Sequence, residues 1–177
     1  NHASIIDSLR LCGCKKIVFP HLDIDFVEEI LGRPHSEGKT FLVTESLFSM
    51  DGDVAPLETY ARLTGKYGAC LIVDDAHATG VFGGSRGSGL TETFGVERHA
   101  VAIVSTFGKA LGLFGAFVAG PRVMIQYLIN RSRPFIFTTA VPPLLLYGIE
   151  AALDRLEATP ERRGQVRDLA DRLRNHL

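Results

Sequence analysis

Apolar residues in this chain form two alternating kinds of run, short continuous runs and longer runs with helical spacing. The continuous runs predict strands at residues 40–44, 70–73 and 100–105. Apolar residues three or four positions apart predict helices at residues 57–67, 123–130 and 143–156. Strands that alternate with helices of this length are typical of βαβ units. We therefore expect an α/β fold in which a mostly parallel sheet is flanked by helices.

Shorter elements are predicted around this framework. Helices are expected at residues 26–31 and 90–94, and Asp23 is the expected N-cap of the first of these. Residues 1–8 are expected to be a loop that leads into a short helix. Further strands are expected at residues 16–20, 114–119 and 135–139, and a polar loop at residues 33–39. The last two strands lie close together along the chain, so one of them can run antiparallel to the rest.

A boundary is predicted near Pro160, where apolar content falls and a charged helix begins. Residues 1–159 are expected to form one domain, and residues 160–177 to be the start of a second, truncated one. The chain begins without a methionine, on a polar cluster typical of a fold's interior, and ends within a helical pattern. We expect it to be a segment of a longer protein.

Bulk composition excludes some classes of partner. The formal net charge is −1 and the pI is about 6.7, so there is no electrostatic reason to expect nucleic acid or an anionic membrane as a partner. No apolar segment reaches the ~20 residues that a membrane-spanning helix needs. The three cysteines cannot pair evenly, which favours reduced thiols in the cytoplasm.

Polar side chains follow two of the predicted strands at the points where they end. Asp74, Asp75 and His77 follow the strand at residues 70–73, and Thr106 and Lys109 follow the strand at residues 100–105. Because ligands of open α/β sheets bind outside the carboxyl ends of the strands, we expect these groups to share a cleft.

Lys109 lies between glycines at a strand-to-loop junction. A phosphate-binding P-loop is excluded, because Ile103 and Ala110 occupy positions where that motif requires Gly and Ser or Thr. The remaining chemistry for a lysine in such a place is carbonyl chemistry, namely a Schiff base with an aldehyde cofactor.

Two groups of residues could instead hold a metal ion. Asp74 and His77 are close enough in sequence to bind a divalent cation, but an aspartate at a strand end can also pair with a protonated pyridine nitrogen. The second reading is favoured once a Schiff-base lysine follows. His21, Asp23 and Asp25 alternate along the chain, and there we favour Asp23 as a helix cap. We expect no metal site.

Two further motifs have ordinary explanations. Ser85 lies in a G-x-S-x-G pattern typical of serine hydrolases, but that pattern needs a strand before it and a helix after it. The segment before Ser85 is too short for a central strand, so a hydrolase is the weaker alternative. Cys12 and Cys14 are not accompanied by the second pair of ligands that a structural zinc site needs, and they are expected to be thiols without a special role.

Five blocks of sequence, taken together, resemble the α-oxoamine synthases. They are NHASIID at residues 1–7, ESLFSMDGDVAPL at 45–57, DDAHATG at 74–80, TFGKALG at 106–112 and FIFTTAVPP at 135–143. These enzymes use pyridoxal phosphate, have the aspartate aminotransferase fold, and join an amino acid to an acyl-CoA with loss of carbon dioxide. The resemblance implies that the chain is the central part of the large domain of such a fold-type I enzyme.

The resemblance also implies roles for the residues that lie around the cofactor ring. Lys109 would be the Schiff-base lysine and then the acid and base at the substrate's α-carbon. Asp74 would keep the pyridine nitrogen protonated, and His77 would hydrogen-bond the phenolic oxygen. His2 would stack on the ring, and these four form the implied catalytic set.

Other residues match positions that contact the cofactor's periphery or the substrate. Ser49 and Thr106 lie where the family places cofactor contacts, and Glu45 where it places a substrate contact. Thr139 resembles the residue that reaches the phosphate of the neighbouring subunit's cofactor, which implies a homodimer.

Two of these blocks bear on the branch of the family. The DDAHATG and MDGDVAPL runs are most similar to the branch that condenses alanine with pimeloyl-CoA, while branches using glycine or serine remain open. Ser8 and Leu22 stand where members usually carry Gly and Asn. A phosphate-binding loop and most of the small domain would lie outside these residues, so the segment alone is expected to be inactive. A non-catalytic partner subunit is a further alternative, against which the retained Lys109 argues.

Overall fold

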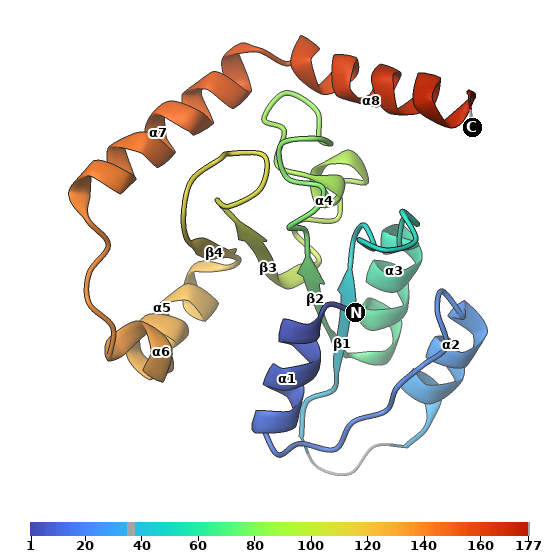
Figure 1. Cartoon of the computed structure of the whole chain (residues 1–177). Coiled ribbons are helices and arrows are strands. Elements are labelled where there is room, and N and C mark those ends of the chain that lie inside the picture. Colours follow the sequence, from blue (N-terminus) through green and yellow to red (C-terminus); the bar gives the residue numbers. More distant parts are fainter. Residues whose placement is uncertain (35–37, 177) are drawn as a thin grey trace.

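One four-stranded sheet forms the centre of the molecule (Figure 1). The computed structural model describes residues 1–34 and 38–176. The strands are β1 (Phe41–Glu45), β2 (Cys70–Asp74), β3 (Ala100–Thr106) and β4 (Ala116–Ala119), in that spatial order. The first three are parallel and β4 is antiparallel to β3. The predicted α/β fold with a mostly parallel sheet is confirmed, including one antiparallel strand.

The apolar core lies between this sheet and the helices α2 (Ile24–Gly32) and α3 (Leu57–Tyr67). Asp23 caps α2 as predicted, because its Oδ1 accepts a hydrogen bond from the backbone N–H of Phe26 at 2.9 Å. Tyr60 and Leu63 of α3 are fully buried together with Leu71 of β2. Burial of these apolar side chains is the main source of stability for this half of the molecule.

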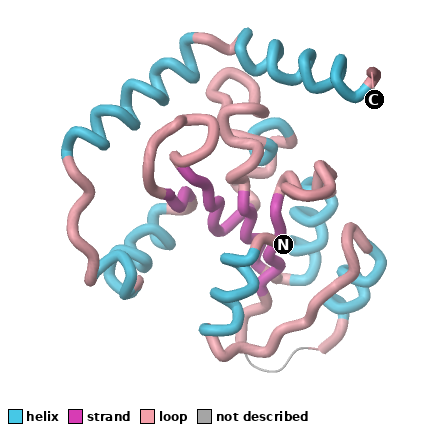
Figure 2. Tube along the Cα trace, in the orientation of Figure 1, coloured by secondary structure: helices cyan, strands magenta, loops and turns pink. Residues whose placement is uncertain are grey.

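The remaining helices are distributed around the sheet (Figure 2). They are α1 (Ala3–Leu11), α4 (Leu90–Thr93), α5 (Arg122–Arg131), α6 (Arg133–Ile136), α7 (Pro143–Ala158) and α8 (Glu161–Arg174). In Figure 1, α7 and α8 form an arc along the periphery. None of the helices in the described ranges is long and apolar enough to span a membrane.

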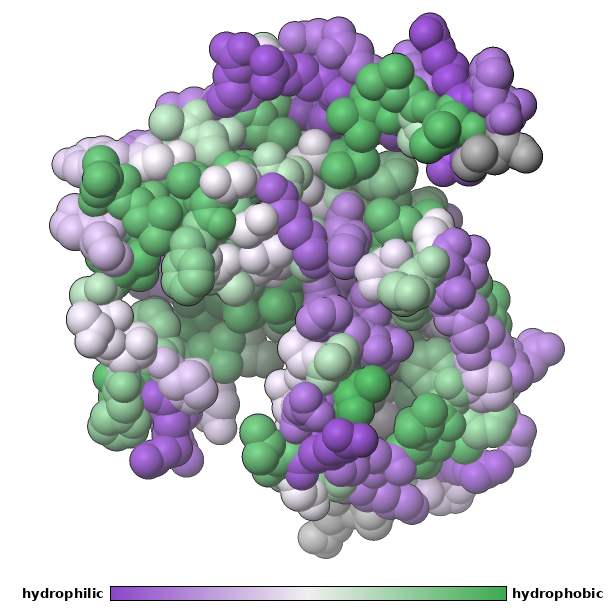
Figure 3. Space-filling view, in the orientation of Figure 1, coloured by the Kyte–Doolittle hydropathy of each residue, from purple (hydrophilic) through white to green (hydrophobic). Residues whose placement is uncertain are grey.

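Helices α5, α6 and α7 contain no buried residue. Their exposed apolar side chains include Tyr127, Phe135, Leu144 and Tyr147, which are 58%, 61%, 83% and 70% exposed. Green atoms gather over α7 in the space-filling view (Figure 3). Exposed apolar side chains on three successive helices are typical of a region that another protein surface covers.

The predicted strand at residues 16–20 is wrong. This segment is irregular, and Val18 is 89% exposed. A strand needs a neighbour for its backbone hydrogen bonds, and β1 pairs only with β2 among the described residues. A short apolar run without a neighbouring strand was therefore not sufficient to form a strand here. Of the predicted loop at 33–39, residues 35–37 lie outside the described part.

The predicted strand at residues 135–139 is also wrong. Its first residues belong to α6, and irregular backbone continues to Pro142. Pro134 lies in the first turn of α6, where its fixed φ favours a helix and its missing N–H is not needed. Phe135 and Phe137 alternate as in a strand, yet both are exposed, so their spacing reflects no pairing with the sheet.

Asp75 connects the end of the sheet to α4. Its carboxylate is fully buried and accepts four hydrogen bonds: from Ser46 Oγ at 2.5 Å, Leu90 N at 3.2 Å, Thr91 N at 3.1 Å and Thr91 Oγ1 at 2.7 Å. A Cβ at Gly89 would lie 2.4 Å from Asp75 Oδ2, so only glycine leaves room for this contact. The carboxylate thus joins the loop after β1, the end of β2 and α4.

We predict that Asp75→Asn lowers the free energy of unfolding by about 2–4 kcal/mol, because an amide NH₂ would face donors in a buried network. Chemical denaturation of the two proteins measures the difference. Asp51→Asn, at an exposed turn, is the matched control and should change stability by less than about 0.5 kcal/mol. Equal stability of the Asp75 variant and the parent would contradict this account of the network.

Candidate functional site

A cavity of about 410 Å³ lies at the carboxyl ends of β1, β2 and β3. It brings together six of the eight predicted site residues, which are His2, Glu45, Asp74, His77, Thr106 and Lys109. The register aligns Glu45 with Asp74, so β1 and β2 end level, and it aligns Asp74 with Val104, so β3 extends further, to Thr106. Four of the five strand-end groups expected to share a cleft, Asp74, His77, Thr106 and Lys109, line this cavity. The expectation is wrong for Asp75, which is fully buried.

Asp74 and Asp75 face in different directions. Side chains of successive strand residues alternate between the two faces of a sheet, and here Asp75 enters the core while Asp74 lines the cavity. Asp74 Oδ1 accepts a hydrogen bond from the backbone N–H of Ala76 at 3.0 Å. This turn fixes the carboxylate at the cavity wall, and sequence adjacency alone did not show which aspartate would lie there.

His77 follows in the same turn and is half-buried. Burial lowers the pKa of His77 below its ordinary value, and the positive charge of Lys109 lowers it further. The carboxylates of Glu45 and Asp74 act in the opposite direction on this pKa but do not reverse it. At pH 7 the imidazole is therefore neutral, with one nitrogen able to donate and the other able to accept.

Lys109 lies in the loop between β3 and β4. The hydroxyl of Thr106 forms hydrogen bonds with the beginning and with the end of this loop. Thr106 Oγ1 donates to the carbonyl of Gly115 at 2.9 Å and accepts from the N–H of Gly108 at 3.0 Å. Phe107 N also donates to the Gly115 carbonyl at 2.9 Å. These contacts place the exposed Lys109 at the cavity's edge.

A glycine-rich loop at residues 80–89 packs against Ala110, the residue after Lys109. A Cβ at Gly80 would lie 2.5 Å from the Cβ of Ala110, and Gly80 has a φ of +83°. Both the close approach and the backbone conformation require glycine. The lysine loop is thus positioned from two sides, by Thr106 and by Gly80.

His2 lies immediately before α1 and acts as its N-cap. Its Nδ1 accepts from the backbone N–H of Ser4 at 3.3 Å and lies 2.8 Å from Ser4 Oγ. In the neutral imidazole this acceptor role leaves the proton on Nε2. The cap fixes the ring at the cavity, where Ser4 also contributes to the lining.

Two predicted site residues lie outside the cavity lining. Ser49 is exposed in the turn after β1, and Thr139 is exposed in the segment between α6 and α7. Their roles stay predictions. The lining also includes Ser105, a polar residue at the end of the predicted strand at residues 100–105, together with Ser4, Ala76, Gly108 and Ala116, which sequence reasoning did not single out. Ala76, Gly108 and Ala116 lie next to strand ends, a signal that could have found them, whereas Ser4 lies in the first turn of α1 and carried no such signal.

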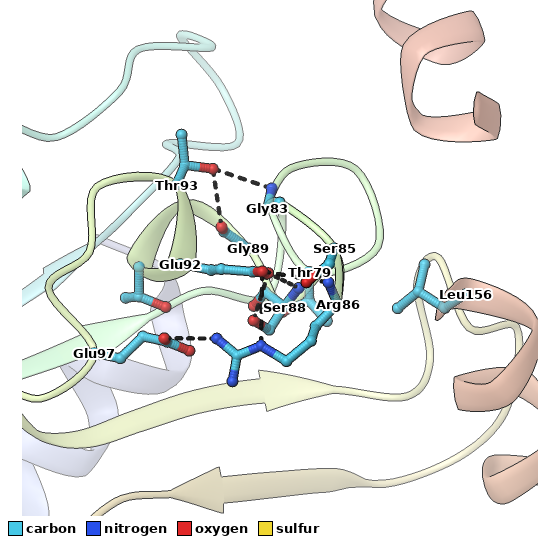
Figure 4. Close-up of polar contacts among 12 residues, drawn as sticks. Thr79, Gly83, Ser85, Arg86, Ser88, Gly89, Glu92, Thr93, Glu97 and Leu156 are labelled. Carbon is cyan, nitrogen blue, oxygen red and sulfur yellow. Dashed lines mark hydrogen bonds and ion pairs between the residues drawn. The ribbon is translucent and has the colours of Figure 1, made fainter. Parts of the chain in front are cut away.

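The loop containing Ser85 does not have the geometry of a nucleophile elbow (Figure 4). Ser85 lies in a bend, and α4 begins only at Leu90. Glu92 accepts from the N–H and hydroxyl of Ser88, at 2.9 and 2.8 Å. Within residues 1–34 and 38–176, the Ser85 hydroxyl forms no hydrogen bond with a base. The loop is a structural connection.

The metal alternatives also lack a ligand set. In the part of the chain that the structure describes, no three His, Cys, Asp or Glu residues are grouped to hold a metal ion. His21 Nε2 lies 2.9 Å from Asp53 Oδ2, and Asp23 caps α2. These contacts account for the polar residues of that segment.

Comparison with known proteins agrees with this architecture. The family model described as aminotransferase class I and II matches residues 1–177. The chain belongs to this family. An 8-amino-7-oxononanoate synthase from Geobacter sulfurreducens is 45% identical to it, over 96% of this chain and 43% of the relative. The chain spans less than half the length of the curated relatives that it matches.

Solved structures of the same family superpose closely on the chain. The structure of SPT with a PLP internal aldimine has a TM-score of 0.88 and 32% identity, covering 95% of this chain and 42% of the other. The 8-amino-7-oxononanoate synthase from Francisella tularensis has a TM-score of 0.78 and 33% identity, covering 92% and 46%. The resemblance to the α-oxoamine synthases is thus confirmed, and with it the fold type.

We predict that Lys109→Gln raises the pKa of His77, because it removes a positive charge that opposes protonation of the imidazole. Burial remains, so only part of the lowering is lost. The titration of the His77 ring protons by NMR measures this change. Lys39→Gln, which removes the same charge ahead of β1 at the opposite end of the sheet, should leave the pKa unchanged. A fall in the pKa of His77 in the Lys109 variant would contradict the electrostatic assignment.

Proposed function

We propose that a full-length protein carrying this chain is a pyridoxal-phosphate-dependent acyltransferase of the α-oxoamine synthase type. The observation that carries the proposal is the grouping of a carboxylate (Asp74), an imidazole (His77) and a primary amine (Lys109) around one cavity at the strand ends. The names of the relatives and the PLP in a structural neighbour support it.

The residues present fit such a cofactor. The cavity's volume of about 410 Å³ lies within the ~300–1,000 Å³ typical of small-molecule sites. Its lining offers an amine for an aldehyde, a carboxylate for a pyridine nitrogen and a neutral imidazole for a phenolic oxygen. When bound, pyridoxal phosphate supplies an electron sink for negative charge at the α-carbon of an amino acid.

Lys109 and Asp74 have the central roles in this proposal. With the cofactor bound, the amine of Lys109 would hold its aldehyde group and would move the proton at the substrate's α-carbon. The carboxylate of Asp74 holds a proton on the pyridine nitrogen through a charge-assisted hydrogen bond. The hydrogen bond from the backbone N–H of Ala76 holds that carboxylate in place through Oδ1 and leaves Oδ2 available.

The two histidines orient the ring. His77 is kept neutral by burial and by Lys109, so one ring nitrogen can donate a hydrogen bond to the phenolic oxygen. His2, held as the cap of α1, stacks on the ring. In addition, Glu45 contacts the substrate, and Ser49 and Thr106 contact the cofactor. The Thr106 hydroxyl already donates its proton to the Gly115 carbonyl. It can donate to a phosphate only if this hydrogen bond to Gly115 is broken.

For the substrates, we propose alanine and pimeloyl-CoA, which condense with loss of carbon dioxide to 8-amino-7-oxononanoate for biotin synthesis. The names of the curated relatives support this choice. The alternative is another α-oxoamine synthase, of the 2-amino-3-ketobutyrate ligase, 5-aminolevulinate synthase or serine palmitoyltransferase type, and the SPT neighbours favour the last of these.

We also propose that the protein is a homodimer in which Thr139 reaches the partner's cofactor phosphate. Support comes from the exposed apolar side chains of α5, α6 and α7 and from the exposed position of Thr139 between α6 and α7. The assignment of residues 1–159 to a large domain and of residues 160–177 to a second one, and the cytoplasmic location, stay predictions.

We predict that borohydride reduction of the full-length protein with pyridoxal phosphate attaches the cofactor covalently to Lys109. Peptide mapping by mass spectrometry locates the adduct. Lys109→Arg, which keeps the charge, should lose the adduct and lower the condensation rate by at least about 100-fold. Lys66→Arg, on α3, is the matched control. An adduct on another lysine in the parent protein would contradict the assignment.

We predict that alanine with pimeloyl-CoA gives the highest kcat/KM among pairs of alanine, glycine or serine with pimeloyl-, acetyl-, succinyl- or palmitoyl-CoA. Product formation by the full-length protein, followed by mass spectrometry, makes the comparison. Faster turnover of serine with palmitoyl-CoA would instead identify the serine palmitoyltransferase branch. Turnover by any pair keeps the α-oxoamine synthase class, whereas a thioester hydrolysis that Ser85→Ala abolishes would replace it.

A further inference from the structure

We propose that Cys12 and Cys14 form a reversible redox pair that closes to a disulfide by exchange with a low-molecular-weight disulfide. This site lies at the end of α1 and does not depend on the proposed enzymatic activity. It is a modification site on the surface of the molecule, and its co-reactant is a small disulfide of the glutathione class.

The backbone brings the two thiols together. Cys12 is the C-cap of α1, and Gly13 follows with a φ of +65°, a left-handed conformation that favours glycine. The chain therefore reverses between the two cysteines, and the sulfur atoms lie 2.6 Å apart. Both residues are exposed, so a small disulfide can approach them without any opening of the fold.

The surroundings make the two thiols unequal. The hydrogen bond from Cys14 lowers the pKa of the Cys12 thiol, and the charge of Lys16 lowers it slightly further. The pKa of the Cys14 thiol is raised by the same contact. Because the thiolate is the nucleophile in exchange reactions, Cys12 is the first to react.

The reaction balances without a further oxidant. The Cys12 thiolate attacks one sulfur of the small disulfide, forms a mixed disulfide and expels one thiolate. The Cys14 thiolate then attacks the Cys12 sulfur, forms the intramolecular bond and expels the second thiolate. The protein loses two electrons and two protons, and the small disulfide becomes two thiols. A transient bond of this kind is the usual form of a disulfide in a reducing compartment.

The pair has a defined structural consequence. In the reduced form, Cys12 Sγ donates a hydrogen bond to the carbonyl of Leu9 at 3.2 Å, and this bond caps the last turn of α1. The disulfide removes that donor and constrains the C-cap. Metal binding by two thiols is the less favoured use, because the described residues supply no third ligand nearby.

The test is equilibration of the full-length protein with mixtures of reduced and oxidised glutathione, followed by acid quenching, alkylation and peptide mass spectrometry. The expected result is a peptide carrying an intramolecular Cys12–Cys14 bond that dithiothreitol reverses. Cys14→Ser should lose this bond and accumulate glutathione on Cys12. Cys70→Ser is the matched control, because Cys70 lies in β2, and it should retain the bond.

Two results would overturn the proposal. One is a parent protein in which Cys12 and Cys14 stay reduced while Cys70 is modified. The other is stable glutathione adducts on both Cys12 and Cys14 of the same molecule, which would show that the second thiol does not resolve the first. Neither result depends on whether the protein condenses amino acids with acyl-CoA.

Discussion

The buried carboxylate of Asp75 is the interaction on which the rest of the site depends. A buried charge is tolerated only when its hydrogen-bonding capacity is filled, and here Ser46, Leu90 and Thr91 supply all four donors. These donors come from the loop after β1 and from α4, so the carboxylate fixes both to the end of β2. Strand alternation then leaves Asp74 at the cavity. The aspartate that lines the cavity is thus positioned by the buried aspartate that follows it.

The amine of Lys109 is positioned by different means. Its loop carries no buried charge and is held by the Thr106 hydroxyl and by the close approach of Gly80 to Ala110. The glycine-rich loop is in turn bound by Arg163 of α8. This residue is 3% exposed, and its guanidinium donates to the carbonyls of Gly84 and Leu156, each at 2.7 Å. The lysine's surroundings therefore include a helix more than fifty residues further along the chain.

Sequence patterns predicted most elements because their causes are local. Asp23 as a cap and Gly68 at the end of α3 are read directly from the residues. The segments at 16–20 and 135–139 failed because a strand needs a partner, which no local pattern supplies. For the site, the strand-end rule alone grouped Asp74, His77 and Lys109. Glu45 and His2 required the family resemblance, since their cavity positions depend on register and on the cap of α1.

The cavity lining offers too few hydrogen-bond donors for the phosphate of the proposed cofactor. Pyridoxal phosphate carries a dianionic group that needs several N–H or O–H donors, and in the described lining the carboxylates of Glu45 and Asp74 would repel it. The Thr106 hydroxyl is engaged with Gly115, and Lys109 is assigned to the aldehyde. Because a dianion needs several donors, further ones would come from outside this lining. In the proposed homodimer, Thr139, which is exposed between α6 and α7, would give one such donor to a second copy of the chain, so covering the apolar side chains of α5, α6 and α7 and completing the phosphate site would be the same event.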